Sequence, residues 1–251
     1  MRWLLALLLL SPISSQAEEV VLGLSQDEVS ISTTFDGDEI LIFGAVRREA
    51  PVPDGPPLQV LVTVSGPLEP VTVRRKERVA GIWVNTDAVE VDLAPSYYAI
   101  ATTGTMSAVL SEVEDLRHKV SIPRAIRSVG APMTIEDAES FTDALIRIRD
   151  GSGLYRLEEG TVDLEADTLF RAAVELPANL VEGDYETRIF LTRGGAVVDR
   201  YVTTINVHKV GLERWLFDLA HEQPLVYGLM SLAIAIAAGW GASAAFRALS
   251  R

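Results

Sequence analysis

Histidine, serine and acidic residues are the side chains in this 251-residue chain that could carry out chemistry. The three histidines, His118, His208 and His221, are far apart in the sequence, and no HExxH motif is present. A zinc site needs several ligands at close spacing, and a typical serine hydrolase needs a G-x-S-x-G elbow, which is also absent. The sequence therefore predicts no catalytic residue, no metal site and no cofactor, and we expect a protein that is not an enzyme.

The chain contains no cysteine. Disulfides, thiolate metal ligands, a cysteine nucleophile and the acylated cysteine of a bacterial lipoprotein are therefore excluded. Gly151-Ser152-Gly153 lacks the pattern of a phosphate-binding loop and is typical of the end of a helix. Neighbouring carboxylates such as Glu158 and Glu159 are expected by chance among 35 acidic residues, and they indicate solvated faces.

The formal charge of the chain is −13, from 22 basic and 35 acidic residues. Three of the basic residues, Arg2, Arg247 and Arg251, lie in the terminal segments, so 19 basic and 35 acidic residues leave −16 for the region between them. Such a charge repels phosphate backbones and anionic lipid alike, and we expect no nucleic-acid partner.

One short stretch is basic, with four cationic side chains: Arg74, Arg75, Lys76 and Arg78. It lies at the end of an expected strand and is a candidate contact patch for an anionic group, such as a lipid headgroup or the acidic surface of a partner. The alternative is a solvated hairpin whose charges keep a sheet edge soluble.

The N-terminus has the features of a secretory signal. A positive start at Arg2 precedes a short apolar run that ends at Leu10, too short to span a bilayer. Small residues at Ser15 and Ala17 fit the −3 and −1 positions of signal peptidase. We expect residues 1–17 to be cleaved, so that the mature chain begins at Glu18.

The C-terminal part contains an uncharged run of 22 residues from Leu225 to Phe246, close to the roughly 20 that cross a bilayer. We expect a transmembrane helix at 224–246 and a cytoplasmic tail at 247–251, because arginines follow the run and acidic residues precede it. The expected location is the bacterial inner membrane, as a single-pass protein with a periplasmic N-terminal domain.

Small residues recur every four positions within this run, at Ser231, Ala235, Gly239 and Ser243. Such a ridge lets a second helix approach closely and predicts a membrane-protein partner or a homo-oligomer formed through the span. The alternative is that small residues are simply common in bacterial spans. An amphipathic juxtamembrane helix is expected at 209–223, with Trp215 as its anchor at the bilayer interface.

Short β-branched segments separated by turn residues fill the range 18–105. Val29–Thr33 and Ile40–Val46 flank a turn and predict a hairpin, and further short strands are expected downstream. They are expected at 59–65, 71–75, 82–85, 89–93 and 97–102. This pattern favours antiparallel sheets packed as an immunoglobulin-like β-sandwich.

The range 106–150 is expected to be a helical insertion. Leu110, Val113, Leu116 and Val120 have helical spacing, and a second helix is expected from an N-cap at Thr134. Its apolar stripe comprises Ile135, Ala138, Phe141, Leu145 and Ile148.

Strands resume over 151–208 and include a hairpin with its turn at Gly194-Gly195. Gly183-Asp184-Tyr185 resembles the tyrosine corner of many sandwiches. The expected fold is thus mainly β, with one C-terminal transmembrane helix. The two β-rich ranges could form two small sandwiches, which we slightly favour, or one composite sandwich.

The segments Ile40–Ala45, Gly81–Thr86 and Ala94–Ala101 resemble a family of alphaproteobacterial transmembrane proteins, and the resemblance covers the whole chain. Trp83 within the second segment is expected to be a core residue; the alternative is a surface docking role. The resemblance implies a neighbouring sulfite-exporter-like permease and hence an accessory role. We therefore expect a non-enzymatic interaction module for a membrane protein, anchored in the lipid bilayer; the alternative is a periplasmic binding module for a small solute or envelope polymer, with a pocket between the β-rich ranges.

Overall fold

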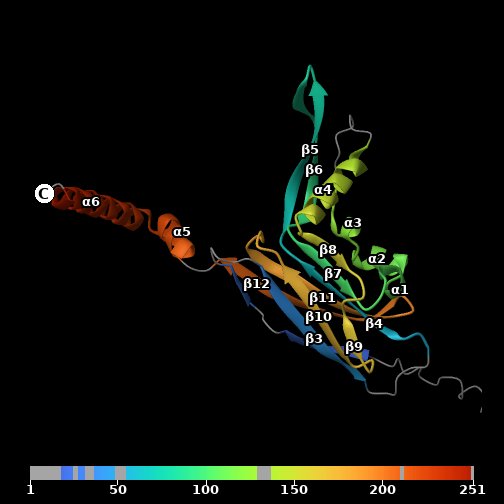
Figure 1. The fold of residues 1–251 in the computed structure, drawn as a ribbon. Coiled ribbons are helices and arrows are strands. Elements are labelled where there is room, and N and C mark those ends of the chain that lie inside the picture. The colour runs from blue at the N-terminus through green and yellow to red at the C-terminus, as the bar shows by residue number, and fades with distance from the viewer. Residues whose placement is uncertain are drawn as a thin grey trace, which may run out of the picture. The chain divides into compact units, whose positions relative to one another are not determined.

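The computed structural model describes residues 18–24, 28–31, 37–48, 55–128, 137–209 and 212–249. Within them the chain forms two main sheets, a separate two-stranded ribbon and two groups of helices (Figure 1). The predicted signal peptide and the predicted N-cap at Thr134 lie outside the described residues.

The smaller main sheet has four strands in the order β1-β3-β10-β9. Its strands are β1 (Glu18–Leu24), β3 (Asp38–Arg48), β10 (Leu169–Leu176) and β9 (Asp163–Glu165). All three pairings are antiparallel. Strand β1 was not predicted from the sequence. It pairs with β3, where the predicted hairpin would have placed Val29–Thr33.

The larger sheet has six strands in the order β2-β12-β11-β4-β7-β8. Its strands are β2 (Glu28–Ile31), β12 (Ala196–Lys209), β11 (Gly183–Arg193), β4 (Leu58–Ser65), β7 (Tyr98–Thr102) and β8 (Tyr155–Glu158). Strands β7 and β8 run parallel, because the helical insertion connects them. The predicted hairpin of β2 with β3 is wrong, since these two strands belong to different sheets.

Both sheets combine strands from both β-rich ranges of the sequence. Strand β3 pairs with β10 in one sheet, and β4 pairs with β11 in the other. The two ranges therefore build one composite sandwich rather than two separate ones.

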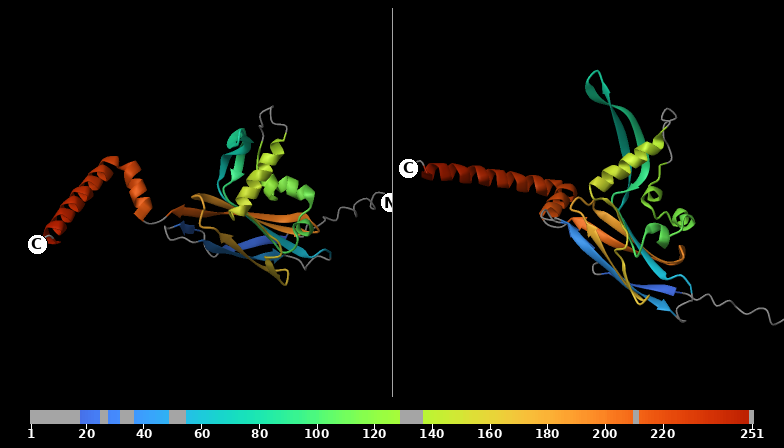
Figure 2. Two further views of the ribbon diagram at one scale, coloured as in Figure 1. Left: turned by 45° about the horizontal axis from the view of Figure 1, so that its top comes forward. Right: turned by 45° about the vertical axis from the view of Figure 1, so that its right-hand side comes forward.

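The core of the sandwich lies between the sheets. Ile40 and Ile42 of β3 and Val174 of β10 are almost fully buried, as are Val60 and Ile189 of the larger sheet. Strand β4 is buried on both faces, because the smaller sheet covers one face and helices cover the other (Figure 2).

Four helices form the insertion: α1 (Met106–Val109), α2 (Glu112–His118), α3 (Ile122–Ala125) and α4 (Ala138–Gly151). The expected single helix before residue 120 is broken at Leu110-Ser111, where Ser111 caps α2. Leu110 and Val120 are buried as predicted, but Val113 and Leu116 face solvent, because the break rotates α2. In α4, Phe141 and Leu145 are buried, whereas Ile148 is exposed.

The predicted hairpin of β11 and β12 is confirmed. Gly194 and Gly195 have φ values of 55° and 81°, a left-handed turn that glycine adopts without strain. The predicted tyrosine corner is also present, since the Tyr185 hydroxyl donates a 2.7 Å hydrogen bond to the Val181 carbonyl. Burial raises the pKa of Tyr185 to about 12, so this hydroxyl stays protonated.

Strands β5 (Leu68–Val79) and β6 (Ile82–Pro95) form a sheet of their own. The sequence predicted several short strands here, and the structure instead has one long antiparallel hairpin with two register irregularities, one between Glu69 and Val71 and one between Arg75 and Lys76. We call this hairpin the arm. Figures 1 and 2 show the arm standing away from the sandwich, with α4 along its base.

A second compact unit of the chain contains α5 (Leu212–Glu222) and α6 (Pro224–Leu249). The residues from Pro224 to Ser243 are long and apolar enough to cross a membrane, and none of this segment is buried in the chain. This agrees with the span predicted at 224–246. Helix α5 lies within the predicted juxtamembrane range.

Candidate interaction surfaces

The predicted basic patch lies on β5, in the outer half of the arm. Arg74, Lys76 and Arg78 are exposed there. Among the described residues, neither Arg74 nor Lys76 has a carboxylate within ion-pair distance, and Arg78 donates only a long 3.4 Å hydrogen bond to the Gly81 carbonyl. These three cations are therefore available to an outside partner.

Arg75 differs from its neighbours because it faces α4. Its guanidinium donates to Asp137 Oδ2 at 2.6 Å and to Ser140 Oγ at 2.8 Å, and it lies 4.6 Å from the ring centre of Phe141. The same guanidinium lowers the pKa of the Asp137 carboxyl. Arg75 thus joins the arm to α4. It was predicted to be part of the contact patch, but its guanidinium group binds Asp137 and Ser140 instead.

The end of the arm is apolar. Ala80 and Gly81 form the turn, both with positive φ, and the side chains beside it are open to solvent. Val79 is 51% exposed, Ile82 65% and Trp83 69%. The prediction that Trp83 is a core residue is wrong: the end of the ribbon extends beyond α4, so nothing in the described chain covers it.

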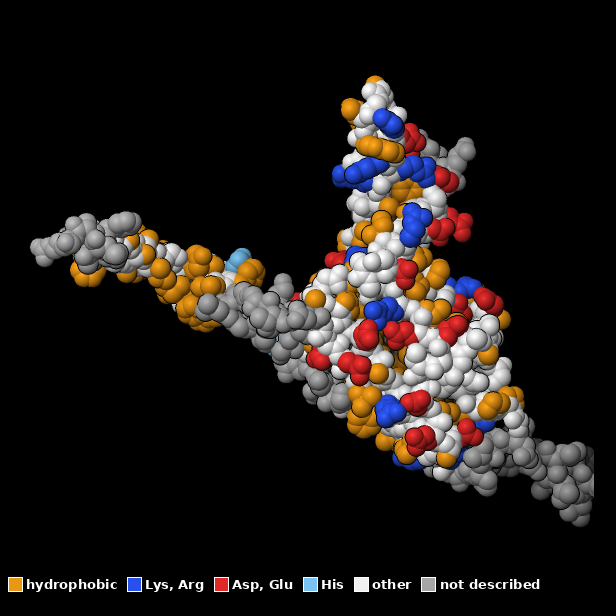
Figure 3. Space-filling view, viewed as in Figure 1, with side chains coloured by type: hydrophobic (Ala, Val, Ile, Leu, Met, Phe, Trp, Pro, Cys, Tyr) orange, Lys and Arg blue, Asp and Glu red, His pale blue; other side chains and the backbone are white. Residues whose placement is uncertain are grey.

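Strand register places the tip residues on two faces. Arg78 is paired with Trp83 and Lys76 with Asn85, so these side chains share one face. Val79 is paired with Ile82 on the opposite face. Figure 3 shows hydrophobic side chains together with Lys and Arg side chains in the outer part of the arm.

The predicted packing ridge lies on one face of α6. Ser231, Ala235, Gly239 and Ser243 are all exposed, and a Cβ added at Gly239 would meet no atom within 4 Å. Gly241 lies on the other side of the helix and is equally open. Among the described residues, an added Cβ at either glycine would therefore meet open space.

The predicted interfacial anchor, Trp215, lies on α5 and is 51% exposed. Phe217, in the same helix, is 62% exposed and stacks on His221 with ring centres 4.0 Å apart. Two aromatic rings thus precede the candidate span, as is common where a helix meets a bilayer interface.

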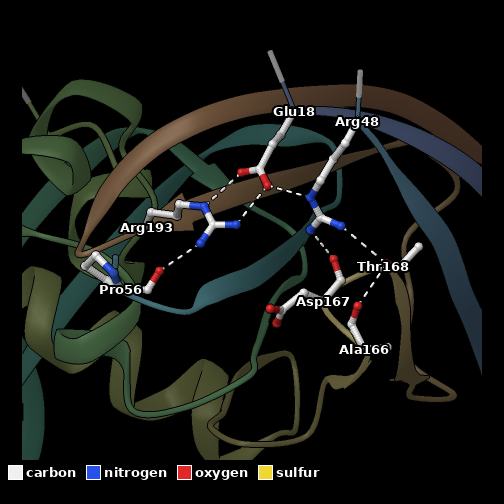
Figure 4. A network of polar contacts seen from close by, with 7 residues as sticks. All are labelled: Glu18, Arg48, Pro56, Ala166, Asp167, Thr168 and Arg193. Carbon is white, nitrogen blue, oxygen red and sulfur yellow. Dashed lines mark hydrogen bonds and ion pairs between the residues drawn. The ribbon is translucent and has the colours of Figure 1, made fainter. Parts of the chain in front are cut away.

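A buried ion network holds Glu18, the first residue of β1, and no local sequence pattern predicted it. The carboxylate of Glu18 accepts hydrogen bonds from Arg48 at 2.7 Å and from both Nε and Nη2 of Arg193, at 2.9 and 2.8 Å (Figure 4). Its side chain is only 4% exposed. Arg193 also donates to the Pro56 carbonyl at 2.8 Å.

Arg48 completes this network by donating to the carbonyl oxygen of Asp167 and to Thr168 Oγ1 (Figure 4). The network therefore joins β1, β3 and the start of β10 to the end of β11. The hydrogen bond from Arg193 is the main reason that the pKa of Glu18 is below its ordinary value of 4.5, and Arg48 adds to this effect. Glu18 thus links β1 to β3 and β11 through charged hydrogen bonds.

The histidines lie in separate surroundings. His118 Nε2 lies 3.3 Å from Glu114 Oε2, and its ring packs edge-on against Phe190. His221 is exposed on α5. Across the described ranges, no group of three or more His, Asp or Glu side chains is arranged to hold a metal ion.

One cavity of about 440 Å³ lies beside the β3–β10 pair. Asp38 and Glu39 line it on one side and Arg156 and Glu175 on the other, together with Leu176 and Pro177. Arg156 already pairs with both Glu158 and Glu175. The cavity lies between the two β-rich ranges, where the solute-binding alternative predicted one.

Taken together, a β-sandwich domain with a projecting arm and a helix that can cross a bilayer define a membrane protein with one candidate span. The chain belongs to the family described as putative transmembrane protein (Alph_Pro_TM), whose pattern matches residues 19–248. This confirms the resemblance noted in the sequence. A comparison with curated proteins finds no match.

Proposed function

We propose that this chain is a non-enzymatic interaction module, anchored in the inner membrane and accessory to another membrane protein such as a sulfite-exporter-like permease. The observation that carries the proposal concerns α6: from Pro224 to Ser243 none of it is buried in the chain, and it presents small residues along one ridge. Small side chains allow two helix backbones to approach closely within lipid.

The proposed topology follows from charge. Arg247 and Arg251 follow the span and Glu213, Asp218 and Glu222 precede it, so we place the segment after the span in the cytoplasm and the β-sandwich in the periplasm. Cleavage after Ala17 would release Glu18 as the mature N-terminus, next to its two arginine partners. N-terminal sequencing of the purified protein tests this step.

Co-purification tests the partnership. The tagged full-length chain is extracted from its native host in mild detergent, and the proteins recovered with it are identified by mass spectrometry. Gly239→Leu places a large side chain on the ridge, whereas Gly241→Leu places the same side chain on the other side of the helix. We expect a membrane protein that is recovered with wild type and Gly241→Leu and lost with Gly239→Leu; equal recovery with both variants would contradict docking through the ridge.

The cavity beside β3 and β10 favours a second candidate, a binding module for a small solute. Asp38 accepts a 2.8 Å hydrogen bond from the Glu39 backbone N–H, and neither Asp38 nor Glu39 has an ion-pair partner among the described residues, so the two carboxylates suit a cationic ligand. A thermal-shift screen of cationic solutes on wild type and on Glu39→Gln tests it. A solute that raises the unfolding temperature of wild type alone would support this function, and no shift with any solute would count against it.

A further inference from the structure

The free end of the arm carries two kinds of side chain in a defined order. Val79 and Ile82 lie next to the turn, and Trp83 and Arg78 form the next cross-strand pair toward the base. Lys76 and Arg74 come two and four residues further from the turn than Arg78. At a rise of roughly 3.3 Å per residue, the three cations occupy a band of about 13 Å that begins at the level of Trp83.

This order matches the layers of a phospholipid surface. Trp and aliphatic side chains favour the boundary between headgroups and acyl chains, and Lys and Arg reach phosphate groups just above it. Clusters of basic residues beside a membrane bind anionic lipids. We propose that the end of the arm is a second membrane-contact site, at which Val79, Ile82 and Trp83 enter the surface of an anionic phospholipid bilayer and Arg74, Lys76 and Arg78 bind lipid phosphates.

The distribution of apolar groups favours lipid over a protein groove. Val79 and Ile82 point to one face of the ribbon and Trp83 to the other, so the end is apolar all round. A protein groove covers one face of a ribbon, whereas a fluid bilayer surrounds an inserted end on every side. The candidate span also holds the chain at a membrane, which gives the arm a high local concentration of lipid.

The acidic remainder of the chain does not cancel the local charge of the arm. Strand register pairs Arg74 with Ala88, and between these positions there are four cationic side chains and two carboxylates, Glu77 and Asp87. Of the four cations, only Arg75 has ion-pair partners among the described residues, namely Asp137 and Asp87. Charges further away than about 8 Å are largely screened at physiological ionic strength. The free end therefore presents a net positive surface despite the total of −13.

The absence of cysteine allows a direct test, because one introduced cysteine accepts a fluorophore at a single position. Val79→Cys places an environment-sensitive dye on the arm, and Val198→Cys places it on the sandwich, where the native side chain is similarly exposed at 46%. The full chain is reconstituted, one copy per lipid nanodisc, in phosphatidylcholine alone or mixed with phosphatidylglycerol. Vesicles of the same two compositions are then added from outside, so that a bilayer on either side can be reached.

We expect a blue shift and a several-fold rise in emission from the dye at position 79 with anionic lipid, in the disc or in the added vesicles, and no change at position 198. Reversal of Arg74, Lys76 and Arg78 to Glu should abolish the change, and Trp83→Ser should reduce it. No change in any lipid would overturn the proposal. A change that depends on protein concentration and not on lipid would also overturn it, and would indicate a second copy of the chain.

This proposal is independent of docking through α6. Gly239→Leu should leave the dye response of the arm unchanged, and charge reversal on the arm should leave co-purification through the span unchanged. Failure of one test is therefore distinguishable from failure of the other.

Discussion

Glu18 shows how a single residue can hold the start of a fold. Its carboxylate is buried and satisfied by two arginines from strands far along the chain, so removal of its charge leaves both guanidinium groups short of a partner. Breaking a buried charged contact of this kind costs far more than breaking a surface pair. The first strand of the smaller sheet therefore depends on one side chain.

We predict that Glu18→Gln destabilises the protein by about 2 kcal/mol at neutral pH. Because the pKa of Glu18 is lowered in the folded state, its contribution is complete above the ordinary value of 4.5 and is lost as the pH falls through the lowered pKa. Thermal unfolding of the full chain in detergent across this range measures the effect, and the difference from wild type should shrink in acid.

Glu19→Gln is the matched control for this prediction. Glu19 pairs with Arg47, but both side chains are more than half exposed, so its removal should change stability little. A loss equal to that of Glu18→Gln, or a loss at position 18 that persists unchanged in acid, would contradict the assigned role.

Arg74 and Arg75 are adjacent residues with different roles, and this difference can be tested. We predict that Arg75→Ala speeds hydrogen exchange along α4, because it removes the bonds to Asp137 and Ser140 and the contact with Phe141. Arg74→Ala should leave the exchange of α4 unchanged, since its side chain is exposed and bonds to nothing on that helix. Equal hydrogen-exchange rates of α4 in Arg75→Ala and Arg74→Ala would contradict the contact between the arm and α4.

Among the elements, the arm departs most from the sandwich around it. Its base is held by α4 and buries Val73, Val89 and Val91, whereas its end is free. An isolated two-stranded ribbon is only marginally stable in water. The packed base therefore supports the exposed end.

We predict that Trp83→Ser changes the free energy of unfolding by no more than about 0.5 kcal/mol, because the indole is mostly exposed. Phe141→Ala, in contrast, removes a ring that is 2% exposed and should cost about 3 kcal/mol. Denaturant unfolding compares the two variants. A large loss from Trp83→Ser would show that the end of the arm is packed against something in the folded chain.

The elements that the sequence predicted well are those fixed by local signals. The hairpin of β11 and β12 follows from two glycines at its turn, and β4 matches the strand expected at 59–65. The arm was read as short separate strands with a core tryptophan, because a free ribbon and a packed one share the same alternation. The residues that pack over a strand are distant from it in the sequence, so a local pattern cannot predict whether the strand is buried or exposed.

Contacts between distant residues also explain why the sequence did not predict the ion network and predicted the interaction surfaces only in part. Arg48 and Arg193 lie 30 and 175 positions from Glu18, so only the folded sheets bring them together. The sequence shows the basic stretch, but it could not predict that Arg75 contacts α4 while Arg74 and Lys76 do not. That distinction requires the position of α4.

At the scale of the whole molecule, the described chain combines a β-sandwich, a projecting arm and one helix that is long and apolar enough to cross a membrane. The sandwich supports an arm, the span enters the membrane, and the candidate docking groups are exposed in the single chain. We propose that α6 contacts another membrane protein through one face.

Site-specific photocross-linking in native membranes tests this claim most directly. A photoreactive amino acid is placed at Ala235 on the ridge or at Ala237, which is also exposed and lies about 200° away around the helix. We predict one defined cross-linked product from position 235, identified by mass spectrometry as a membrane protein, and none from position 237. Equal products from both positions, or none from either, would contradict the account.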